Sequence, residues 1–136
     1  MKLNDYQSGA LRTAPQGHDT NREMLHAVLG LVTEAGELAD ALKKQLAYGK
    51  PVDRVNLIEE AGDVLWYLPL LARALGTDLE TIGRINLEKL RKRYPDKFSE
   101  DLANHRTLEV ERETLERLST PSAHRNISLL DHGDES

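Results

Sequence analysis

Hydrophobic and polar positions along this chain recur at intervals of three and four residues, which is the spacing of an amphipathic α-helix. The stretches with this spacing end at prolines and glycines, which interrupt helices. The pattern predicts five helices, and they cover a short segment within residues 1–14 and the ranges 21–48, 53–75, 78–94 and 104–118. No stretch alternates with the two-residue period of a β-strand, so we expect an all-α protein.

The third predicted helix should be the most buried element, because Val64 to Leu75 is apolar on nearly all sides. Pro69 removes one backbone hydrogen bond from it, so we expect a kink there. The core of the predicted antiparallel helical bundle comes from three helices: 21–48, 53–75 and 78–94. Such a core is thin, and we expect oligomerisation to complete it.

Composition narrows the class of protein. A length of 136 residues fits one domain, and a net charge of −5 argues against general binding to nucleic acid or to a membrane surface. No apolar run reaches the roughly 18 residues that span a bilayer, and no signal-peptide pattern opens the chain. Cysteine is absent, which excludes disulfides and thiolate metal sites. We therefore expect a cytoplasmic protein without a membrane or nucleic-acid partner.

One acidic quartet occurs in each of two consecutive predicted helices, as Glu34-Ala35-Gly36-Glu37 and as Glu60-Ala61-Gly62-Asp63. Two carboxylates three residues apart lie on the same face of a helix. Four carboxylates that face one another in apolar surroundings repel and lose hydration, so they take up protons or bind a cation. Oxygen ligands favour a hard ion, Mg²⁺ first and Mn²⁺ second. The alternative is two unrelated, solvated acidic faces.

Each quartet also contains a glycine inside a predicted helix. Gly36 and Gly62 each cost roughly 0.5–1 kcal/mol relative to alanine at such a position. We therefore expect something to approach the backbone closely at both glycines. A ligand and a tightly packed helix are both compatible with this expectation.

The helix predicted over 78–94 carries positive charge. Asn86, Lys89 and Arg93 are spaced three and four residues apart and form one polar stripe. A cationic stripe that faces a divalent ion is the arrangement needed to bind a polyphosphate, because the metal and the cations share its charge. A solvated basic face is the alternative.

Two further residues are candidate ligand contacts. Lys44 lies on nearly the same helix face as Glu34 and Glu37, from which it would reach the same ligand. Tyr67 lies four residues after Asp63 and would stack on, or hydrogen-bond to, a base or sugar. A place in the core is an equally good interpretation of Tyr67.

These motifs together resemble the all-α nucleoside triphosphate pyrophosphohydrolases of the MazG-like superfamily, in its short single-domain phage and bacterial form. The resemblance spans roughly residues 22–98 and includes Leu29-Gly30-Leu31, Gly62 to Tyr67 and Lys92-Arg93-Tyr94-Pro95. The chain departs from the family pattern at Thr33, where the family often has the first of two adjacent glutamates.

The resemblance implies hydrolysis of a (d)NTP between its α and β phosphates, which yields a nucleoside monophosphate and pyrophosphate. It implies Mg²⁺ ligands and catalytic carboxylates at Glu34, Glu37, Glu60 and Asp63. It implies substrate contacts at Lys44, Tyr67, Asn86, Lys89 and Arg93. It also implies a homodimer or homotetramer. We accordingly expect a catalytic domain over 1–98, an accessory helix over 99–118 and a flexible tail over 119–136.

Two other functions remain open. The first is a non-catalytic helical module whose acidic patch binds a metal or docks a basic partner. The second is a carboxylate-bridged di-iron protein, since Glu23-Met24-Leu25-His26 has the form E-x-x-H. Di-iron bundles need two such motifs and this chain has one, which disfavours that function.

Overall fold

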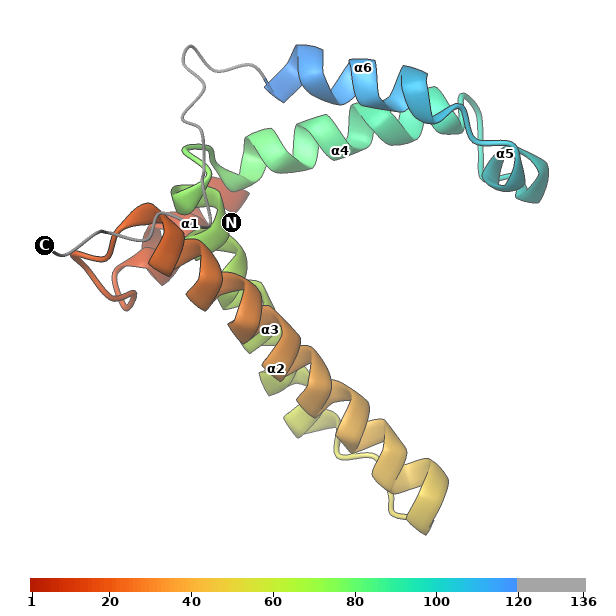
Figure 1. The fold of residues 1–136 in the computed structure, drawn as a ribbon. Helices are drawn as coiled ribbons and strands as arrows, with labels where there is room; N and C mark the ends of the chain where they lie inside the picture. The colour runs from red at the N-terminus through yellow and green to blue at the C-terminus, as the bar shows by residue number, and fades with distance from the viewer. Residues whose placement is uncertain (120–136) are drawn as a thin grey trace, which may run out of the picture. The chain divides into compact units, whose positions relative to one another are not determined.

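A computed structural model describes residues 1–119, and this part of the chain contains helices and no strand. The all-α prediction is confirmed. The elements are α1 (Leu3–Leu11), α2 (Thr20–Tyr48), α3 (Arg54–Ala74), α4 (Leu79–Arg93), α5 (Glu100–Asn104) and α6 (Leu108–Ser119), as labelled in Figure 1. The predicted flexible tail lies, apart from its first residue, outside the described residues. No helix in residues 1–119 is long and apolar enough to cross a membrane.

The ends of the long helices follow local capping signals. The Asp19 carboxylate accepts a hydrogen bond of 2.9 Å from the Arg22 N–H at the start of α2. Asp53 does the same for the first turn of α3. Gly49 ends α2 with φ at 63°, a left-handed conformation that L side chains rarely adopt. The predicted bounds of these two helices are therefore correct to within one residue.

The region after α4 differs from its prediction. A short helix, α5, precedes the predicted accessory helix, and α6 begins at Leu108 rather than at 104. The Ser99 side chain caps α5 by accepting the Leu102 N–H, and His105 is the C-cap that follows Asn104. The sequence interpretation missed this helix because its five residues are too few to show an amphipathic period.

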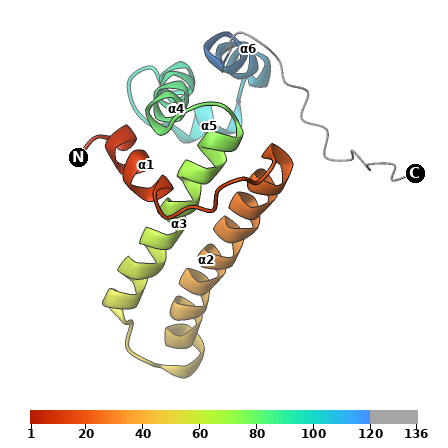
Figure 2. The same ribbon diagram turned by 90° about the vertical axis from the view of Figure 1, so that its left-hand side faces the viewer.

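The chain forms two compact units, residues 1–79 and the segment from Glu80 onward. In the first unit α2 and α3 lie side by side as an antiparallel hairpin, and α1 packs on α3 (Figure 2). All but the first residue of α4 belongs to the second unit, so its predicted place in the core stays a prediction. The domain bounds at 98 and 118 likewise stay predictions.

The core of the first unit is small and lies on the second half of α3. Buried Ala14, Ala27 and Leu70 form its centre, and partly buried Trp66 and Tyr67 pack against them. Helix α3 continues through Pro69, which is fully buried together with Leu70. The second half of α3 thus holds the buried residues Pro69, Leu70, Ala72 and Ala74, as predicted, whereas Leu65 and Leu75 are exposed.

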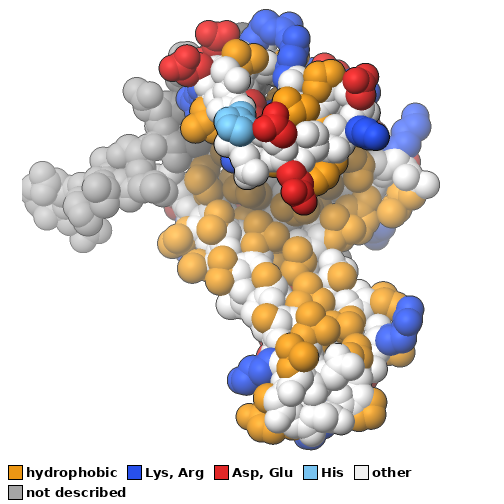
Figure 3. Space-filling model, turned by 90° about the vertical axis from the view of Figure 1, so that its right-hand side faces the viewer, with side chains coloured by type: hydrophobic (Ala, Val, Ile, Leu, Met, Phe, Trp, Pro, Cys, Tyr) orange, Lys and Arg blue, Asp and Glu red, His pale blue; other side chains and the backbone are white. Residues whose placement is uncertain are grey.

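Large apolar side chains remain exposed along the outer face of the hairpin. Figure 3 shows hydrophobic side chains spread over this part of the surface. On α2 they include Leu25, Leu29 and Val32, and on α3 they include Val55, Ile58 and Leu65. We call these six residues the outer stripe. Each helix therefore has one face toward its neighbour and a second apolar face without a partner in residues 1–119.

Candidate metal centre

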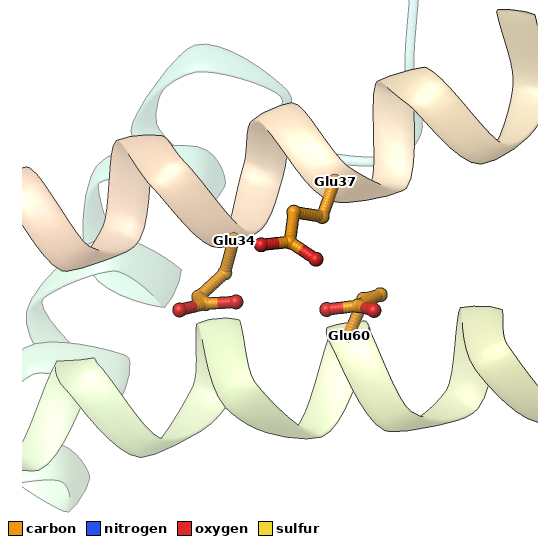
Figure 4. A group of neighbouring side chains, drawn as sticks. All are labelled: Glu34, Glu37 and Glu60. Carbon is orange, nitrogen blue, oxygen red and sulfur yellow. The ribbon is translucent and has the colours of Figure 1, made fainter.

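Three carboxylates from two helices converge between α2 and α3. Glu34 and Glu37 come from α2 and Glu60 from α3 (Figure 4). One potential ligand atom from each of the three side chains lies within 4.8 Å of the others. The two glutamates of α2 are one turn apart, and the antiparallel pairing places Glu60 opposite them. The structure thus brings together three of the four predicted metal ligands.

The three carboxylates differ in their surroundings. Glu60 is buried, Glu34 is partly buried and Glu37 is exposed. The Asn56 side chain donates a hydrogen bond of 2.7 Å from Nδ2 to Oε1 of Glu60. This bond fixes one oxygen of the buried carboxylate and leaves the other for a further partner. Asn56 lies four residues before Glu60 on the same helix face, a spacing that the sequence interpretation overlooked.

The cluster lacks compensating positive charge. Desolvation raises the pKa of Glu34 above its usual value, and the charges of Glu37, Asp63 and Glu60 add to the effect. Within residues 1–119 no lysine or arginine forms an ion pair with Glu34, Glu37 or Glu60. Carboxylates held close together without a counter-ion favour either a proton or a metal cation.

The donor set fits a hard divalent ion. All the donors are oxygens, which Mg²⁺ and Mn²⁺ accept more readily than softer metals do. With metal–oxygen distances of about 2.1 Å, opposite ligands of an octahedral Mg²⁺ ion lie about 4.2 Å apart. A separation within 4.8 Å is close to this span.

Asp63, the fourth predicted ligand, is exposed and lies outside this group of three. Its charge nevertheless raises the pKa of Glu34 and, together with burial as the larger cause, that of Tyr6. Asp63 is therefore near the cluster on the side where α1 packs on α3. Its role as a metal ligand stays a prediction.

Lys44 is a neighbour of the cluster rather than a member of it. Its Nζ forms an ion pair of 2.8 Å with Asp40 on the exposed surface of α2. The Asp40 hydrogen bond and charge raise the pKa of Lys44, and the more distant charge of Glu37 acts in the same direction. A contact between Lys44 and a substrate stays a prediction, and it requires the Asp40 pair to be exchanged.

Tyr67 packs inside the first unit, as the core interpretation expected. Its ring contacts His26 edge-on at 5.7 Å and Trp66 edge-on at 4.9 Å between ring centroids. A methyl group added at Gly30 would overlap the Tyr67 ring. Gly30 therefore provides the room that this ring needs on α2. A nucleotide contact by Tyr67 stays a prediction.

A close approach at Gly36 and Gly62 is not found within residues 1–119, and an approach by a ligand or another chain stays a prediction. No atom of the described chain lies within 4 Å of the position that a side chain would take at either glycine. At 100° per residue, Gly36 falls on the same face of α2 as Leu29 and Val32, away from Glu34. The glycines therefore lie on the exposed apolar face and not beside the carboxylates, and the close contact found within residues 1–119 is at Gly30.

The predicted basic stripe lies on α4, in the second unit. Asn86 is exposed and Lys89 is partly buried. Arg93 is bound to Glu111 of α6 by a bidentate ion pair. Contacts of these three α4 residues with a substrate stay predictions. The sequence interpretation missed Glu111, since the pairing spans 18 residues and two helices.

Fold and site together define an all-α protein with a carboxylate cluster suited to a divalent metal between two antiparallel helices. Residues 22–98 match the MazG nucleotide pyrophosphohydrolase domain, and the chain belongs to this family. The predicted family resemblance is thereby confirmed.

Two other proteins are similar in sequence to this chain. The Gene 37 protein of Mycobacterium phage L5 is 38% identical over 101 residues, which covers 68% of this chain and 89% of the phage protein. The uncharacterized protein YvdC of Bacillus subtilis (strain 168) is 36% identical over 73 residues, or 47% of this chain and 69% of that protein. No solved structure matches significantly.

Proposed function

We propose that this protein hydrolyses (deoxy)nucleoside triphosphates between the α and β phosphates, with Mg²⁺ as the metal and Mn²⁺ as a substitute. The products are a nucleoside monophosphate and pyrophosphate. The observation that carries the proposal is the convergence of Glu34, Glu37 and Glu60 within 4.8 Å, with no ion pair to a lysine or arginine of residues 1–119. Membership of a nucleotide pyrophosphohydrolase family supplies the reaction class.

The chemistry of phosphoryl transfer suggests a role for the metal and for each carboxylate of the site. Bound Mg²⁺ supplies polarisation of the phosphate and a lowered pKa for the attacking water. Glu60, held by Asn56, gives the site one fixed oxygen on α3. Glu34 and Glu37 complete the site from α2, and a carboxylate of the cluster accepts the proton that the water loses. Because the reaction needs positioning and charge stabilisation, no histidine or nucleophilic serine is required.

A pair of neighbouring glutamates provides the test. Glu37→Gln keeps the shape of the side chain and removes its charge, so turnover should fall by at least about 10²-fold, the scale for losing one group that stabilises a transition state. Glu59→Gln is the control, because Glu59 is exposed on α3 and lies outside the cluster. The assay is pyrophosphate release from a panel of dNTPs and NTPs, with and without Mg²⁺.

The outcomes separate the enzyme from the non-catalytic module. Mg²⁺-dependent release that survives Glu59→Gln and disappears in Glu37→Gln supports the proposal. Full activity of Glu37→Gln would contradict the assignment of the carboxylates. Absence of pyrophosphate release from every nucleotide, with metal binding intact, would instead favour a metal-binding interaction module.

We further propose that a second copy of this chain covers the outer stripe. Leu29, Val32, Val55 and Ile58 are each more than half exposed, although such a row is uncommon on a monomer. Gly36 and Gly62 fall within the same faces of α2 and α3, where absent side chains allow two helices to come close. The apolar stripe of one helix can pack against the same stripe of a second copy, as a two-fold dimer requires.

The oligomeric state tests this proposal. Val32→Asp places a charge in the middle of the stripe and should convert a dimer or tetramer into a monomer. Leu108→Asp makes the same chemical change at an exposed position of α6 and should leave the assembly unchanged. Light scattering coupled to gel filtration measures both, and a wild-type monomer at all concentrations would refute the proposal.

A further inference from the structure

The second unit contains a charge cluster made of residues other than the carboxylates of the candidate metal centre. Glu111 of α6 accepts a hydrogen bond of 2.7 Å from Nε of Arg93, and its other oxygen binds Nη2 of the same guanidinium. That second oxygen also accepts a bond of 3.1 Å from Nη2 of Arg106. One carboxylate thus holds two guanidinium groups at the same place.

Two of the three charged side chains in this cluster are largely buried. The Glu111 side chain is 8% exposed and the Arg93 side chain 15%, whereas Arg106 is 44% exposed. The hydrogen bonds from Arg93 first, and then from Arg106, lower the pKa of Glu111 to about 2. Glu111 therefore stays ionised at neutral pH. Two permanent cations share its single negative charge, which leaves one positive charge uncompensated.

A cavity of about 130 Å³ adjoins this cluster. Its polar lining consists of Lys92, Arg93, His105, Arg106, Thr107 and Glu111. Lys92 is exposed and forms no ion pair within residues 1–119. With His105 neutral, three cations and one carboxylate give the lining a net charge of +2.

We propose that this cavity binds a small phosphate-type oxyanion, either free phosphate or pyrophosphate or the phosphate tail of a nucleotide. Guanidinium groups present parallel N–H donors that match such an anion, and Lys92 adds a further charge. At about 30 Å³ per water, the cavity has the volume of roughly four waters, which suits a phosphate group.

Glu111 acts here as a positioning residue. Two guanidinium groups brought together without a carboxylate would repel each other and separate. Because Glu111 binds both, Arg93 and Arg106 are already side by side before an anion arrives. Only some of their five donors each are used by Glu111, so donors remain for a ligand.

Metal-free titration of the full-length chain tests the proposal independently of the proposed hydrolysis. Inorganic phosphate, pyrophosphate and dATP are titrated separately in the presence of a chelator, with heat as the readout. Arg106→Gln should weaken binding about tenfold or more, the scale for one charge-assisted bond. Arg112→Gln is the control, because Arg112 is exposed on α6 and pairs with Glu116.

Each outcome decides one point. Loss of phosphate or pyrophosphate binding in Arg106→Gln alone supports a site for the free oxyanion. Loss confined to dATP supports a site for the nucleotide tail. Equal binding by wild type and Arg106→Gln, equal weakening by both variants, or no binding at millimolar ligand would overturn the proposal. Circular dichroism confirms that Arg106→Gln, altered at a side chain 44% exposed, retains its helices.

Discussion

Replacing Gly30 by alanine adds one methyl group at the point where α2 meets the Tyr67 ring. Two effects oppose each other. Alanine favours the helix by about 1 kcal/mol over glycine. The added carbon, however, would overlap the ring, and overpacking of this kind typically costs about 1–3 kcal/mol.

The surroundings of Tyr67 decide which effect is larger. The ring lies edge-on against His26 and Trp66. Trp66 is itself held by a hydrogen bond of 2.8 Å from Nε1 to the Thr13 hydroxyl. Tyr67 therefore cannot turn aside without moving this set of contacts. We expect Gly30→Ala to destabilise the protein by about 1–2 kcal/mol, or roughly 3–6 °C in melting temperature.

Gly36→Ala supplies a matched control on the same helix. Nothing in the described chain occupies the space beside Gly36, so at concentrations where the chain is monomeric this variant should gain about 0.5–1 kcal/mol. Urea and thermal unfolding measure both variants. A Gly30→Ala protein as stable as wild type, or more stable, would refute the packing of Tyr67 against α2.

Three further predictions concern charge. In the metal-free protein the raised pKa of Glu34 makes the folded state bind a proton that the unfolded state has lost, so stability should fall as pH rises above 4.5. Glu34→Gln or added Mg²⁺ should flatten that profile, and unfolding midpoints at several pH values would show it. The lowered pKa of Glu111 acts in the opposite sense: its stabilisation is complete above pH 4.5 and is lost as pH falls toward about 2. If Glu111→Gln lost stability at low pH in the same way as wild type, that result would contradict the buried ion pair between Arg93 and Glu111. Finally, Asn56→Ala releases the carboxylate of Glu60 and should weaken metal binding about 10–100-fold, measurable by Mn²⁺ titration, whereas unchanged affinity would exclude a supporting role for Asn56.

Local signals explain why the helices of the first unit could be predicted. Asp19 and Gly49 terminate α2 through contacts within a few residues, and such contacts are visible in the sequence. The spacing of Glu34 and Glu37 likewise fixes their common face. We expected consecutive helices to pair, and this pairing places Glu60 opposite Glu34 and Glu37.

The contacts of the glycines and of Arg93 could not be predicted from local sequence patterns. Gly30, Gly36 and Gly62 all interrupt helical patterns, yet of these three only Gly30 has a close neighbour among residues 1–119. That distinction depends on which residue of α3 lies opposite, which no local pattern specifies. Arg93 is similar, because its partner Glu111 is reached only after the intervening helix α5 has turned the chain back.

The two faces of α2 and α3 lead to a last prediction. The carboxylates lie on the inner face and the outer stripe on the opposite one, so a change in the stripe should leave the geometry of Glu34, Glu37 and Glu60 intact. Val32→Asp should therefore still bind Mn²⁺ with near wild-type affinity, even as a monomer.

Its turnover then reveals whether one chain forms a complete active site. If a second copy supplies substrate contacts, monomeric Val32→Asp should bind metal normally and lose most pyrophosphate release, because no lysine or arginine in residues 1–119 forms an ion pair with Glu34, Glu37 or Glu60. Full turnover by that monomer would show that the cations of its own chain suffice. Loss of metal affinity together with turnover would contradict the separation of the two faces.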